Sequence, residues 1–156
     1  MFNDADLMTL CAFEEANLEP DDGVAAVIRV LLNRTKLKYS SDGTMAGTVF
    51  RHDQFSWTEW AMQGDKYTEV AQSPYQVQTR AMSLLQADEA YRAAWGRIEA
   101  IVFKVTTGAY AGGLDYKKIT SETVLYYNPK LITPPPEWAR PIKLDASIGN
   151  HRFYHA

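Results

Sequence analysis

The stretch FEEANLEPDDGVAAVIRVLLNR, residues 13–34, decides the predicted fold, because it contains the junction between two helices. Pro20 disfavours helix at the residue before it, so a first helix has to end there. Asp21 and Asp22 then place negative charge where the dipole of a second helix favours it. Apolar residues follow at helical spacing and end at Asn33–Arg34. The sequence therefore predicts a largely buried second helix that follows a turn rich in glutamate.

The rest of the chain predicts further helices and a small sheet. By apolar spacing and capping residues, helices are expected over residues 4–17, 73–91 and 91–108, and strands over residues 123–127 and 148–154. Residues 38–47 and 108–122 indicate loops, residues 48–62 an irregular segment, and the prolines of residues 132–138 an extended chain. The order predicts an α+β fold in one domain, residues 1–156, mainly helical with a small late antiparallel sheet.

Composition excludes several classes of protein. The 156 residues are 46% hydrophobic and 22% charged with a net charge of −3, which is typical of a soluble globular domain. No Lys/Arg cluster favours nucleic acid, and no apolar run is long enough to favour a membrane. The N-terminus lacks the basic region of a signal peptide, so we expect synthesis in the cytoplasm. A monomer is the expected state.

Metal and cofactor motifs are weak. Of the three histidines, His52 has no potential ligand partner at helical spacing, and His151 and His155 lie at the C-terminus. The single cysteine, Cys11, lies on an apolar helix face and is expected to be buried. No glycine-rich phosphate loop occurs. We therefore expect no metal and no cofactor.

The three glutamates of the opening stretch are the first candidates for catalysis. Glu14 shares a helix face with Leu10 and Cys11, whereas Glu15 lies on the flank of that face. A carboxyl near a helix C-terminus with apolar neighbours has a raised pKa, which suits a general acid. Geometry alone slightly favours Glu14. The alternative interpretation is that all three glutamates are solvated charges.

Five motifs in order resemble the cell-wall hydrolase family that includes the spore-cortex-lytic enzymes. The opening motif matches at Glu15, Ala16, Glu19, Pro20, Gly23, Asn33 and Arg34. The second, TVFRHDQFSW, matches at Val49, Gln54, Phe55, Ser56 and Trp57. The later motifs are LYYNP (125–129), PEWAR (136–140) and IGNHRFY (148–154). The resemblance covers essentially the whole chain.

The resemblance implies a lysozyme-like fold that cleaves the glycan strands of peptidoglycan, with Glu15 as the catalytic acid. It further implies lytic transglycosylation between N-acetylmuramic acid and N-acetylglucosamine. One carboxyl then protonates the glycosidic oxygen and afterwards takes a proton from the muramic acid 6-hydroxyl. The expected place of action is the cell wall, in the periplasm, after release from the cytoplasm. A phage endolysin fits this behaviour.

The other matched residues have expected supporting roles. Gln54 and Ser56 would donate or accept hydrogen bonds, to sugar amides or to the backbone near Glu15. Trp57 and Tyr126 would lie under sugar rings, although Trp57 equally fits a core position. Asn128 would bond substrate or cap a turn. Arg34 and His151 are expected to have structural roles.

Two other functions stay open. A hydrolytic muramidase needs a second carboxylate, for which Glu19, Glu59 and Asp53 are candidates. Glu19 is also a candidate cap for the second helix, in which case its loss would affect stability more than chemistry. A non-catalytic glycan-binding protein of the wall is the third hypothesis.

Overall fold

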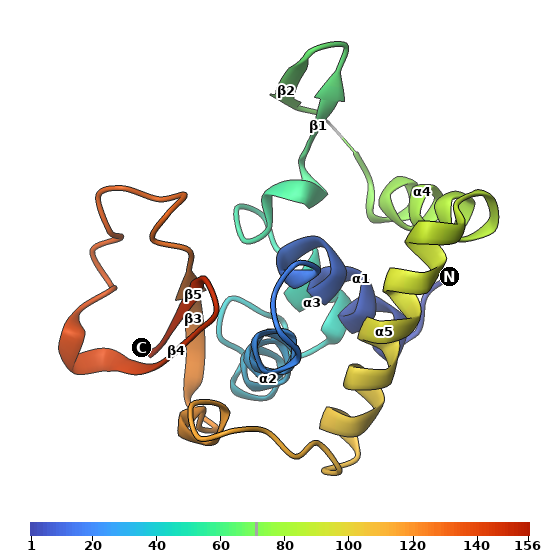
Figure 1. Cartoon of the computed structure of the whole chain (residues 1–156). Coiled ribbons are helices and arrows are strands. Elements are labelled where there is room, and N and C mark those ends of the chain that lie inside the picture. Colours follow the sequence, from blue (N-terminus) through green and yellow to red (C-terminus); the bar gives the residue numbers. More distant parts are fainter. Residues whose placement is uncertain (71) are drawn as a thin grey trace.

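Helices α1 (Asp4–Ala16) and α2 (Asp21–Leu37) lie at the centre of the structure, a computed structural model that describes residues 1–70 and 72–156 (Figure 1). Helix α1 begins at a capping box, in which the Asn3 side chain accepts from the Asp6 amide and the Asp6 side chain accepts from the Asn3 amide. Helix α2 is buried along most of its length, as its apolar sequence predicts. It packs against α1 and against α5 (Glu89–Thr106).

The turn between α1 and α2 is braced by a residue far along the chain. The Arg97 guanidinium, on α5, donates to the carbonyl oxygens of Asn17 and Glu19 and forms an ion pair with Asp21. Buried carbonyl groups at a helix end need such partners. The position of the last turn of α1, which carries Glu15, therefore depends on α5 as well as on α2.

Three late strands form one antiparallel sheet beside α2, on the opposite side from α4 (Pro74–Ala87) and α5 (Figure 1). The strands are β3 (Thr123–Tyr127), β4 (Leu144–Ile148) and β5 (His151–His155), in the spatial order β3-β5-β4. The predicted antiparallel pairing of the two late strands is confirmed, because β3 pairs with β5. Together with the helices, this arrangement confirms the α+β class.

Helix α2 holds the strand that carries Tyr126. The Asn33 side chain donates to the carbonyl oxygens of Thr120 and Thr123, at 2.8 and 2.9 Å. The buried Arg34 donates through Nε to the carbonyl oxygen of Val124, at 2.6 Å. The expected structural role of Arg34 agrees with this contact. The Asn–Arg pair at the end of the apolar run therefore fixes the start of β3 against the helices.

The boundaries of several elements were predicted incorrectly. The expected strand over 148–154 is two strands, because Gly149 and Asn150 form the turn between β4 and β5. The expected loop 38–47 contains the start of α3 (Met45–Val49), which the Thr44 side chain caps. The third and fourth helices meet at Asp88, whose side chain caps α5, rather than at Tyr91. A turn set the first of these boundaries, and polar caps set the other two.

A two-stranded hairpin was missed. Strands β1 (Trp60–Gln63) and β2 (Lys66–Glu69) pair antiparallel, and the hairpin stands away from the helices (Figure 1). The turn residues Gly64 and Asp65 are a hairpin signal that the sequence does contain. The expected irregular segment over 48–62 thus ends in a strand.

The main core lies between α1, α2, α5 and the sheet. Its fully buried members include Val24, Ile28, Ile98 and Phe153. Cys11 is buried in the same cluster, as predicted. Among the described residues, none of the helices combines the length and apolar character that crossing a membrane requires.

Candidate active site

Glu15 lies in the last turn of α1, at the edge of a cavity of about 540 Å³. Its side chain is half-buried, and its Oε1 accepts a hydrogen bond from the Tyr126 hydroxyl at 2.5 Å. In the part of the chain that the structure describes, Oε2 of Glu15 has no hydrogen-bond partner. The carboxyl is therefore held by one oxygen, and the other is available to a ligand.

Burial raises the pKa of the Glu15 carboxyl above its ordinary value. The hydrogen bond from Tyr126 and the positive charge of Arg34 oppose this rise. Burial also raises the pKa of the Tyr126 hydroxyl well above its usual range, so Tyr126 stays protonated and remains a donor. A carboxyl with a raised pKa can be protonated at the start of a reaction and ionised later.

Glu14, which helical geometry slightly favoured, is exposed rather than turned into the core. Partial burial raises the pKa of Glu14 as well, and Arg80 opposes that rise. A raised pKa therefore does not distinguish the two glutamates. The difference is that Tyr126 bonds to Glu15 and that Glu15 is the more buried of the two. The prediction that Glu14 faces the core was wrong.

Glu19 is buried, but it does not cap α2: Pro20 is the N-cap residue, and no side-chain hydrogen bond caps the helix there. Its carboxylate instead accepts from the backbone and side-chain amides of Asn150, at 2.9 and 3.2 Å. His151 Nδ1 lies 3.1 Å from Glu19 Oε1, outside hydrogen-bonding geometry. Burial lowers the pKa of His151, and Glu19 opposes this. Glu19 therefore joins the turn after α1 to the turn between β4 and β5.

The structure brings most of the predicted substrate-binding residues to the cavity beside Glu15. Gln54, Ser56, Tyr126 and Asn128 all line it. Trp57 does not line it, but packs against Phe55 and lines a neighbouring cavity. The alternative core interpretation of Trp57 fits this position better than a place under the sugar beside Glu15.

Gln54 has a defined partner inside the protein. Its side-chain oxygen accepts from Arg34 at 3.3 Å, and Arg34 lies over the ring of Phe55 at 5.6 Å from its centroid. Arg34 in turn holds β3, which carries Tyr126. The QFSW motif, the end of α2 and the β3 strand thus meet behind the Glu15 carboxyl.

One family model, described as Cell Wall Hydrolase, matches residues 18–154. This range is most of the 156-residue chain. The chain belongs to the cell wall hydrolase family. No curated protein and no solved structure matches it significantly. Membership makes this chain an enzyme that acts on the cell wall, with peptidoglycan as its substrate. Glu15 lies just before the matched range, so its role has to be argued from geometry.

The cavity of this cell wall hydrolase is acidic. Among the residues that the structure describes, the lining includes no Lys or Arg but four carboxylates: Glu14, Glu15, Asp53 and Glu59. Negative charge stabilises the positive charge that develops on a sugar ring when a glycosidic bond breaks. The lining therefore suits cleavage of the glycan part of a cell wall.

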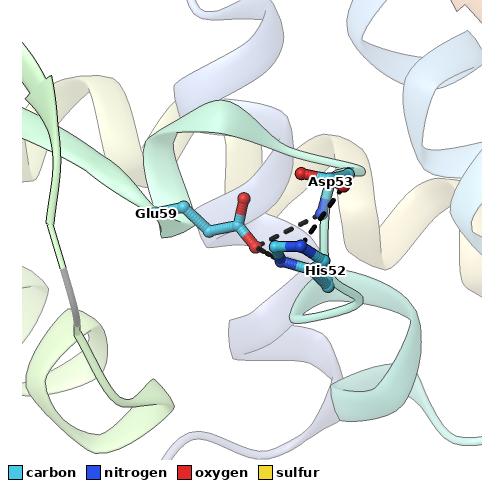
Figure 2. Close-up of side chains that lie close together, drawn as sticks. All are labelled: His52, Asp53 and Glu59. Atoms are coloured by element: carbon cyan, nitrogen blue, oxygen red, sulfur yellow. Dashed lines mark hydrogen bonds and ion pairs between the residues drawn. The ribbon is translucent and has the colours of Figure 1, made fainter.

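Asp53 and Glu59 are joined through an exposed histidine. His52 Nδ1 lies 2.5 Å from Glu59 Oε1, and its Nε2 lies 3.2 Å from Asp53 Oδ2. Figure 2 shows the three side chains turned toward one another. The hydrogen bond to Glu59 and the charge of Asp53 raise the pKa of His52. These three groups have the chemistry of metal ligands, but both ring nitrogens already face carboxylates, so a protonated histidine accounts for the cluster.

Sequence reasoning missed two aromatic residues of the cavity, Tyr127 and Trp60. Trp60, the first residue of β1, lines it and is 37% exposed. Its ring lies beside that of Tyr67 on β2, with centroids 5.6 Å apart. The Gly64–Asp65 turn signal between two short strands would have revealed the hairpin and, with it, this pairing.

Proposed function

We propose that this cell wall hydrolase is a lytic transglycosylase, in which Glu15 is the single general acid and base. Residues 1–156 would act as one catalytic domain. The observation that carries the proposal is the state of Glu15. It is a half-buried carboxyl with a raised pKa, held at one oxygen by Tyr126 and open to an acidic cavity at the other.

The first step uses the protonated form of Glu15. The carboxyl donates its proton to the glycosidic oxygen between N-acetylmuramic acid and N-acetylglucosamine. The bond from that oxygen to C1 of the muramic acid breaks, and positive charge develops on the sugar ring. The carboxylates of the cavity, Asp53 and Glu59 among them, stabilise this charge. The N-acetylglucosamine leaves with a free 4-hydroxyl.

The second step uses the ionised form. The Glu15 carboxylate takes the proton of the muramic acid 6-hydroxyl, and that oxygen bonds to C1. The product is a 1,6-anhydro ring, no water is consumed, and Glu15 is protonated again. Between the two steps Glu15 is a carboxylate, and the hydrogen bond from Tyr126 stabilises this form. One carboxyl therefore completes the cycle.

A hydrolytic muramidase is the second candidate, favoured by one observation. Asp53 and Glu59 line the same cavity as Glu15, so a second carboxylate is available to activate water or to attack the sugar. Both of them contact His52, however, and Asp53 is exposed. Glu19 is a weaker candidate, because its oxygens bind Asn150.

The products distinguish the two reactions. Purified peptidoglycan is digested with the protein, and the soluble muropeptides are analysed by mass spectrometry without prior reduction. Transglycosylation predicts anhydromuramic ends, each lighter by one water than the hydrolytic product. Reducing ends alone would contradict the proposal and favour the muramidase. The absence of any released muropeptide would favour a glycan-binding protein.

A further inference from the structure

The cavity beside Glu15 adjoins two others. A second cavity of about 380 Å³ shares Glu14 and Trp60 with it. A third shares Glu15, Asn128 and His151 with it. The hollow surface around Glu15 therefore extends beyond the first cavity, as a binding site for a polymer requires.

The second cavity has an aromatic wall formed by the missed hairpin. Trp60 and Tyr67 are 37% and 52% exposed, and their rings lie at 5.6 Å. Exposed pairs of large rings on a projecting hairpin bury little inside the protein, so their apolar faces are available to a ligand. The lining of this cavity also includes Leu84 and Arg80 of α4.

The lining of the second cavity is rich in aromatic residues. Besides Trp60 and Tyr67, it includes Trp57 and Tyr91. Ligand cavities are typically lined by aromatic and other apolar side chains with a few polar groups among them. The composition of the second cavity therefore fits a ligand that presents flat, partly apolar faces, as sugar rings do.

We infer that the hairpin residues Trp60 and Tyr67 form a sugar-binding subsite, in which the glycan strand continues from Glu15 into the second cavity. The inference rests on the proposed function, because it takes the glycan strand as the substrate. The Trp60 ring lies at the boundary of the two cavities and contacts the sugar next to the cleaved bond. Tyr67 extends the contact, and Arg80 provides the positive charge of this cavity.

Binding to defined glycans tests the subsite. All variants carry Glu15→Gln, so that the probe is not degraded, and each is titrated against purified intact peptidoglycan and against glycan strands whose peptide stems have been removed. We expect Trp60→Ala to weaken binding to both probes by about 3- to 10-fold, and Tyr67→Ala by a smaller factor. Trp60→Phe should keep most of the affinity. The matched control is Phe103→Ala, which removes a ring that is 68% exposed on α5, outside both cavities.

The outcomes separate this inference from the proposed function. Unchanged binding of Trp60→Ala and Tyr67→Ala to stem-free strands overturns the subsite. Weakened binding only to intact peptidoglycan also overturns it and assigns the hairpin to the peptide stems. Thermal unfolding of each variant checks that the fold is kept. Product analysis of the wild type tests the cleavage reaction independently, so an active enzyme with an unaffected Trp60→Ala variant would contradict the subsite alone.

Discussion

Glu15 and Tyr126 form the contact on which the candidate chemistry depends. Tyr126 is separated from Glu15 by 111 positions, and its hydroxyl reaches the carboxyl because β3 is fixed to α2 by Asn33 and Arg34. This contact makes the ionised form of Glu15 more stable than burial alone would allow. The balance between the two effects determines the pH at which Glu15 changes its protonation state.

Tyr126→Phe should shift the pH dependence of cleavage. The hydrogen bond lowers the pKa of Glu15, so its loss lets burial raise that pKa further. Activity that needs protonated Glu15 will then persist to higher pH. We expect the alkaline limb of the profile to move upward and kcat to fall by about 10-fold, equivalent to about 1.4 kcal/mol. Initial rates of muropeptide release across pH measure both. A limb that moves to lower pH would contradict this role of Tyr126.

Glu15→Gln should change stability in a pH-dependent way. Burial raises the pKa of Glu15 in the folded chain above the ordinary value of a glutamate, so the folded state binds the proton more tightly than the unfolded chain does. The stabilisation from this proton is fully present below the ordinary pKa of a glutamate, about 4.3, and is lost as pH rises through the folded pKa. Glutamine does not ionise, so the variant does not lose this stabilisation. As pH rises, the thermal stability of Glu15→Gln should therefore increase relative to that of the wild type.

Thermal unfolding of Glu15→Gln and wild type, from about pH 4 to about pH 8, measures this difference. Glu122→Gln is the control, because Glu122 is exposed and lines none of the cavities around Glu15. A stability difference for Glu15→Gln that is constant with pH, or that falls as pH rises, would show that the carboxyl is not unfavourably buried.

The sequence predicted which residues line the candidate site better than it predicted where their side chains lie. The motif order pointed to Glu15, whereas helical spacing pointed to Glu14, because spacing within one helix carries no information about a strand more than 100 positions away. The same limit applies to Glu19. Its partner Asn150 lies in a turn late in the chain, so local reasoning assigned the carboxyl to the nearest helix end.

Among the elements, the turn between β4 and β5 is tied to the turn after α1. Glu19 makes this connection through Asn150, and Gly149 has a φ of +57° that favours glycine. A Cβ added at Gly149 would lie 2.9 Å from Glu19 Oε2. The connection therefore sets how the sheet meets the helix that carries Glu15.

Glu19→Ala should mainly reduce stability. The backbone and side-chain amides of Asn150 lose a charged acceptor, which costs about 1.5–3 kcal/mol. The expected fall in the unfolding midpoint is about 3–12 °C. The folded fraction should keep most of its activity at low temperature. Gly149→Ala adds a Cβ in the same turn, close to Glu19, and should also lower the stability of the protein. Unchanged stability with complete loss of cleavage would instead make Glu19 a catalytic residue.

Long elements with clear caps were the best predicted. The α1 and α2 helices and the β3–β5 pairing follow from apolar spacing, capping residues and β-branched composition. The hairpin β1–β2 was missed because its strands have four residues each and lack an apolar alternation. Its register depends on the Gly64–Asp65 turn rather than on burial.

At the scale of the whole molecule, separate parts of the chain line the cavity beside Glu15. Helix α1 supplies the carboxyl, the late sheet supplies Tyr126, and the QFSW segment with its hairpin supplies Gln54 and Trp60. The fold therefore assembles the site from three distant segments. Family membership gives the cell wall as the target.

The most direct test of the account compares Glu15→Gln with Glu14→Gln in turnover of purified peptidoglycan. The two positions are adjacent, line the same cavity and carry the same charge. If Glu15 is the acid and base, Glu15→Gln lowers kcat by a factor of about 100 to 10,000, while Glu14→Gln keeps most of the activity. Both variants should still bind the polymer. Full activity of Glu15→Gln, or equal losses in the two variants, would contradict the assignment.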